Sequence, residues 1–144
     1  MLAHEDGLTP TLELHWGRTL ELHVLAERRT GAELWRHVHL VTTGDRRLAS
    51  FGAIRLRRSS VSRRARVLIL EGRVPLGTIL REHAVAHRRR VSGFFEIAPV
   101  RLPHAGLGVG NEPERLHGRH SVLVSAAAEL MAEVVEILPA AAGE

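Results

Sequence analysis

The most constraining feature of this sequence is a pair of alternating apolar runs between residues 34 and 56. One face of the first run carries Leu34, Arg36, Val38 and Leu40, and one face of the second carries Leu48, Ser50, Gly52, Ile54 and Leu56. Such period-2 patterns are typical of β-strands. The Thr-Thr-Gly-Asp segment between them can form a turn, because glycine accepts a positive φ and aspartate can bond its own backbone. The sequence therefore predicts a β-hairpin here.

Arg36 is the unexpected member of this hairpin. It shares a face with leucines and valine, so it is directed to the side where the core should form. Because a guanidinium cannot lose its charge, this position must hold an anion, supplied either by the protein or by a ligand.

Short elements flank the hairpin. Thr9-Pro10 predicts the start of a helix that runs to Trp16, and residues 19–26 alternate as a strand. Further helices are predicted at about 61–70, capped by Ser59 or Ser60, and at 76–82 after Pro75. A strand is predicted at 87–97, with Val91, Gly93, Phe95 and Ile97 on one face, then a loop at 98–117 and strands at 119–125 and 130–138. This order predicts one α+β domain over residues 1–144, with a single antiparallel sheet of about six strands and short helices gathered on one side.

Composition excludes several classes of site. There is no cysteine, hence no disulfide or thiolate chemistry, and no apolar run long enough for a membrane span, so we expect a cytoplasmic protein. The histidine pairs His37/His39 and His83/His87 lack a third ligand at a diagnostic spacing, so neither a metal site nor a cofactor is predicted. All twenty basic residues are arginine and the net charge is +4. The arginines at 55–66 and 88–90 keep a nucleic-acid-binding alternative open, although aromatic residues for base stacking are scarce.

The last predicted strand holds two carboxylates among apolar residues. Glu133 alternates with Met131, Val135 and Ile137, whereas Glu136 alternates with Val134 and Leu138. A carboxylate in such surroundings could lie in a pocket suited to proton transfer. Equally, Glu133 could form a structural ion pair with Arg36, and the pattern alone leaves both interpretations open.

Taken together, these segments resemble the chorismate pyruvate-lyase family, whose fold is shared by effector-binding domains of some bacterial transcription regulators. The resemblance covers nearly the whole chain. It is carried by Trp35-Arg36 with the following Gly turn and Leu48-Ala49, by Pro75-Leu76-Gly77 with Ile79-Leu80, by Leu116-x-Gly118-Arg119-x-Ser121, and by residues 130–133 ahead of Leu138-Pro139. It implies a chorismate lyase-like fold.

The resemblance also implies roles for individual residues. Arg36 would bind the carboxylate of the aromatic ring, and Glu133 would act near the ring hydroxyl. Glu136 is the alternative candidate for the role of Glu133. Leu76 and Leu8 would offer backbone N–H groups to the ligand. Ser50 stands where the family has a small glycine against the ligand, so its side chain could narrow the pocket or contact the substrate.

Three functions follow from the sequence. The main hypothesis is a cofactor-free and metal-free lyase, monomeric or homodimeric, that eliminates pyruvate from chorismate to give a hydroxybenzoate. The alternative is a non-catalytic binding protein for an aromatic carboxylic acid. The third, a nucleic-acid-binding domain, rests only on the arginine clusters.

Overall fold

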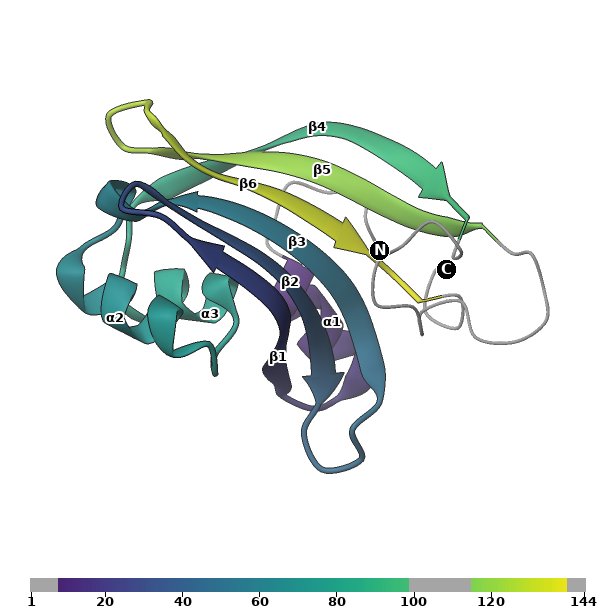
Figure 1. Cartoon of the computed structure of the whole chain (residues 1–144). Coiled ribbons are helices and arrows are strands. Elements are labelled where there is room, and N and C mark those ends of the chain that lie inside the picture. Colours follow the sequence, from purple (N-terminus) through teal and green to yellow (C-terminus); the bar gives the residue numbers. More distant parts are fainter. Residues whose placement is uncertain (1–7, 99–114, 140–144) are drawn as a thin grey trace.

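A computed structural model describes residues 8–98 and 115–139 of the chain (Figure 1). The helices are α1 (Leu8–Trp16), the 3-10 turn η1 (Arg58–Ser60), α2 (Arg63–Glu71) and α3 (Leu76–Glu82). The strands are β1 (Leu20–Arg29), β2 (Glu33–Thr42), β3 (Leu48–Arg57), β4 (His87–Ile97), β5 (Leu116–Ser125) and β6 (Leu130–Ile137).

The six strands form one antiparallel sheet in the order β1-β2-β3-β6-β5-β4. Consecutive strands pair within β1–β3 and within β4–β6. The pairing of β3 with β6 joins these two halves of the sheet. The sheet is strongly curved, and α1, α2 and α3 all lie on its concave side (Figure 1). This arrangement confirms the predicted α+β class and the placing of the helices on one side.

The central hairpin has the predicted faces except at Leu48. A register shift makes Leu48 pair with Val41, and Leu48 packs with Phe51 on the other face of the sheet. Leu40 lies opposite Ser50, Val38 opposite Gly52, and Leu34 opposite Leu56. Gly44, in the turn, has φ of +88°, the left-handed region that glycine tolerates best.

Three predicted boundaries were wrong. The first strand was predicted to end at residue 26, but β1 runs to Arg29. The cap of α2 is Ser62, whose side chain accepts a hydrogen bond from Ala65 N (3.2 Å), because Ser59 and Ser60 belong to η1. The predicted loop at 98–117 is too long, since β5 begins at Leu116; residues 99–114 of that loop lie outside the described part of the chain.

The pattern predicted for β4 also needs a correction. Its bounds, 87–97, are as predicted, but a register shift lies between Val91 and Gly93. Val91 therefore pairs with Ser121 and Gly93 with His120, which are on opposite faces of β5. A β-bulge of this kind reverses the alternation along the strand, and no period-2 pattern reveals it.

Most of the core lies between the helices and the concave face. One cluster joins α2 and α3 to the centre of the sheet, for example Ile69 and Leu80 to Leu56 and Val134. A second cluster packs α1 against β1 and β2, for example Leu12 against Leu22 and Leu40. Among the described residues, no helix is both long enough and apolar enough to cross a membrane.

Candidate functional site

A cavity of about 350 Å³ lies between the concave face of the sheet and the helices α1 and α3. Its size is at the small end of the range for ligand pockets. The helical side is formed by Leu8, Thr9, Pro10, Pro75, Leu76, Gly77, Leu80 and Arg81; the sheet contributes Leu22, Val38, Leu40, Ser50, Gly52, Ile54, His87, Arg89, Leu123, Val134 and Glu136. Most of this wall is apolar, with charged groups confined to a few positions.

Two charged side chains of the cavity wall, Arg89 and Glu136, interact with Arg119 on the strand between them, and we call these three residues the Arg89–Glu136–Arg119 cluster. Arg119 Nε donates to Glu136 Oε1 over 2.8 Å, and Arg89 Nη1 donates to the same oxygen over 3.3 Å. The Arg119 side chain is fully buried, and those of Arg89 and Glu136 are each only 11% exposed. Glu136 is therefore shared between two guanidiniums.

The local environment makes the charge on Arg89 unfavourable. Burial lowers the pKa of the Arg89 guanidinium, Glu136 opposes this effect, and the positive charge of Arg119 adds to the lowering. An arginine nonetheless remains protonated at neutral pH. Glu136 neutralises the charge of Arg89 only in part, because the same carboxylate also binds Arg119. A second anion near Arg89 would therefore be stabilised.

Three of the predicted ligand-contacting residues line this cavity. Leu8 is the first residue of α1, Leu76 is the first residue of α3, and Ser50 lies in the middle of the sheet on β3. They are far apart in the sequence, and the packing of both helices on the sheet brings them around the same space.

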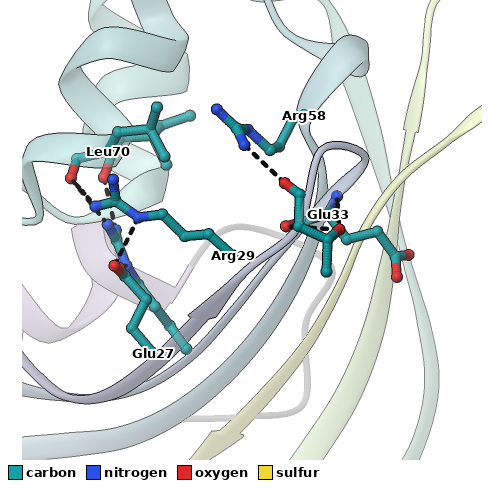
Figure 2. A network of polar contacts seen from close by, with 8 residues as sticks. Glu27, Arg29, Glu33, Arg58 and Leu70 are labelled. Atoms are coloured by element: carbon teal, nitrogen blue, oxygen red, sulfur yellow. Dashed lines mark hydrogen bonds and ion pairs between the residues drawn. The ribbon is translucent and has the colours of Figure 1, made fainter.

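Arg36 is buried, with 5% of its surface exposed, but it does not line the cavity. Its Nε donates to Glu27 Oε1 (2.5 Å), and its other nitrogens donate to the carbonyls of Ile69 (2.6 Å) and Leu70 (3.3 Å) at the end of α2. Arg29 binds the same carboxylate and the Leu70 carbonyl, as Figure 2 shows. The anion that Arg36 requires is thus provided by the protein itself.

Glu133 lies on the opposite face of the sheet from the cavity. It pairs across the sheet with Arg55, and its Oε2 accepts a hydrogen bond from Arg55 Nη1 (3.2 Å). The ion pair between Arg36 and Glu133 that the sequence left open is therefore not formed. Glu136, three residues later, lies opposite Gly52 and lines the cavity.

Sequence reasoning missed Arg89 and the role of Arg119. Arg89 lies in the Arg88-Arg89-Arg90 run, which the sequence connects only with the nucleic-acid-binding alternative. The alternation of β4 distinguishes it, because Arg88 and Arg90 are exposed whereas Arg89 is partly buried. Arg89 alternates with Arg88 and Arg90 along the strand, and this alternation was the signal in the sequence that could have identified it.

Within residues 8–98 and 115–139, no three histidine, aspartate or glutamate side chains gather in a way that could hold a metal ion. The charged groups at the cavity are instead suited to binding an organic anion.

Searches for sequence relatives gave no match, either among protein-family models or among curated proteins. The structure does have similar solved structures. PhnF from Mycobacterium smegmatis matches with a TM-score of 0.70 and 11% identity, covering 99% of this chain and 67% of that one.

A second similar structure is the ligand-binding domain of a protein described as a GntR-family transcriptional regulator from Bordetella bronchiseptica. It matches with a TM-score of 0.57 and 14% identity, covering 83% of this chain and 85% of that one. Identities this low carry a conclusion about fold and none about activity. The chain has the chorismate lyase-like α+β fold, which it shares with these two solved structures.

Proposed function

We propose that this chain is a ligand-binding domain that holds a small aromatic or pre-aromatic carboxylic acid without chemically changing it. The observation that carries the proposal is the cavity of about 350 Å³, with apolar walls and a cationic group at one end. Apolar walls favour a ring, and a few placed polar groups fix its orientation. The likeness to a structure described as a ligand-binding domain supports binding over catalysis.

The test is a titration of the purified chain with 4-hydroxybenzoate, followed by protein NMR. We expect saturable shifts at residues that line the cavity. Ser50→Leu extends a side chain into the cavity and should abolish them, whereas Ala53→Leu, on the opposite face of the same strand, should leave them unchanged. Binding that survives Ser50→Leu, or no binding to the wild type, contradicts the proposal.

Chorismate lyase activity is the second candidate, and Glu136 favours it. Elimination of pyruvate needs a cation for the substrate carboxylate and a group that can move a proton. Because Arg36 and Glu133 lie outside the cavity lining, these roles would fall to Arg89 and Glu136. Release of pyruvate from chorismate, and a fall in turnover of about 10²–10⁴-fold in Glu136→Gln, would favour the lyase over the binder.

A further inference from the structure

Two threonine hydroxyls on the helices beside the cavity have no hydrogen-bond partner in the part of the chain that the structure describes. Thr9, on α1, is only 7% exposed, and the Oγ1 atom of Thr78, on α3, is buried. Thr9 lines the cavity, whereas Thr78 does not. The two residues therefore differ in whether a ligand in the cavity can reach the hydroxyl.

An unpaired hydroxyl in a protein interior is unfavourable, because folding removes it from water without supplying a new hydrogen bond. Valine has the same branched shape as threonine and no such penalty. At position 9 the penalty is offset when a molecule in the cavity provides the missing hydrogen bond, and threonine is then the better residue.

The packing of α1 against α3 leaves space beside the Thr9 hydroxyl. Its Oγ1 lies 3.5 Å from the point where a Cβ of residue 77 would stand, and residue 77 is a glycine that also lines the cavity. Gly77 therefore keeps a side chain away from this hydroxyl at the helical wall.

Thr9 and Arg89 approach the cavity from different walls. The helix α1 packs against β1 and β2, where Leu12 contacts the cluster of Leu22 and Leu40. Arg89 lies on β4, at the opposite edge of the sheet. A ring acid whose carboxylate binds Arg89 would therefore direct the far end of its ring toward α1.

We propose that Thr9 is a specificity-determining residue of the cavity, and that its hydroxyl forms a hydrogen bond with a hydroxyl group at the end of the ligand opposite the carboxylate. A ligand hydroxyl matches Thr9 because each group can both donate and accept. The inference rests on the proposed function, because it requires an organic acid in the cavity. It narrows the ligand class to ring acids that carry a hydroxyl in the para position.

Two ligands and one substitution test this inference on the purified full chain. In 4-methylbenzoate a methyl group replaces the hydroxyl of 4-hydroxybenzoate, and in Thr9→Val a methyl group replaces the hydroxyl of the protein. Calorimetric titration gives the four affinities of the cycle. Thr9→Val should shift the ratio of the two affinities toward 4-methylbenzoate by about 3- to 10-fold, the usual effect of one neutral hydrogen bond. Thr9→Ser keeps the hydroxyl and should keep the wild-type ratio.

Thr78→Val is the matched control, because it removes a buried unpaired hydroxyl that does not line the cavity. It should leave the ratio of affinities unchanged. Both valine variants should melt at or above the wild-type Tm, since each loses an unpaired hydroxyl. A lower Tm of Thr9→Val together with an unchanged ratio would assign the Thr9 hydroxyl to the fold and refute the inference.

Failure of the inference is distinguishable from failure of the proposed function. If both acids bind but the ratio is the same in wild type and Thr9→Val, or shifts equally in Thr78→Val, the inference fails while the binding function stands. If neither acid binds to wild type, or both bind unchanged to Ser50→Leu, the proposed function itself fails. Should Thr9→Val not fold, Thr9→Ala removes the same hydroxyl and takes its place in the cycle.

Discussion

Arg36 is a buried cation whose charge is balanced inside the protein. Glu27 provides the opposite charge, and the last carbonyls of α2 accept its remaining hydrogen bonds. A cation at the C-terminal end of a helix is also favoured by the helix dipole. Arg36 therefore links α2 to the sheet. The neighbouring helix α3 forms one wall of the cavity.

The first residue-scale prediction concerns Glu27 and pH. Burial alone would raise the pKa of Glu27, but hydrogen bonds from Arg36 and Arg29 outweigh it and hold the pKa below its ordinary value. A carboxylate of this kind stabilises the fold above the unfolded-state pKa of about 4.3, and the contribution is lost as the pH falls through the folded-state pKa. Glu27→Gln should therefore cost about 1–3 kcal/mol at pH 7.

Urea unfolding from pH 7 down to pH 2 provides the measurement. The difference between wild type and Glu27→Gln should shrink as the solution becomes acidic, because the wild-type carboxyl is then neutral too. Glu21→Gln is the control, since Glu21 is exposed on the same strand and pairs only with His23 among the described residues. A difference that is the same at pH 2 and pH 7 would show that the charge of Glu27 is unimportant.

This pair also shows what a sequence can and cannot reveal about a single residue. Alternation correctly placed Arg36 on the buried face, because strand geometry fixes the face from parity alone. The partner could not be predicted, since Glu27 lies across from Arg36 only after a register shift between Val24 and Ala26 in β1.

At the scale of the element, Gly118 allows β5 to pack against its neighbours. A Cβ added there would lie 2.4 Å from Phe95 Cζ and 3.0 Å from the Glu136 carbonyl oxygen. No real side chain tolerates such contacts, so Phe95 occupies space that glycine leaves empty. Gly93, on the adjacent strand β4, has no atom within 4 Å of the same added carbon.

The two glycines give a matched prediction. Gly118→Ala should destabilise the protein by roughly 1–3 kcal/mol through overpacking. Gly93→Ala should be neutral or stabilising by up to about 1 kcal/mol, because alanine restricts the unfolded chain. Chemical denaturation of both variants measures the difference, and equal effects would mean that the close approach of Phe95 does not limit position 118.

At the scale of the whole molecule, the sequence predicted the fold better than the site. Periodicity identified the helices and strands because each depends on nearby residues. The cavity depends instead on the pairing of β3 with β6, which brings Ser50 and Glu136 to the same space as Leu8 and Leu76. The last strand offered two glutamates of opposite parity, and only the pairing decides which one meets the cavity.

The arrangement of arginines over the whole molecule makes a final prediction about nucleic acids. Three of the six arginines in the cluster at 55–66 are engaged within the protein: Arg55 binds Glu33 and Glu133, Arg58 donates to the Thr30 carbonyl, and Arg66 to the Val61 carbonyl. These three interrupt a continuous track of arginines for phosphates. Binding to duplex or single-stranded DNA should therefore be no tighter than the nonspecific range, a Kd of about 10⁻⁴ to 10⁻⁶ M at physiological salt. Fluorescence anisotropy at 50 and 200 mM salt measures this, and sequence-dependent binding with a loss of about 10³-fold or more between the two salt concentrations would instead reveal a surface with six or more phosphate contacts.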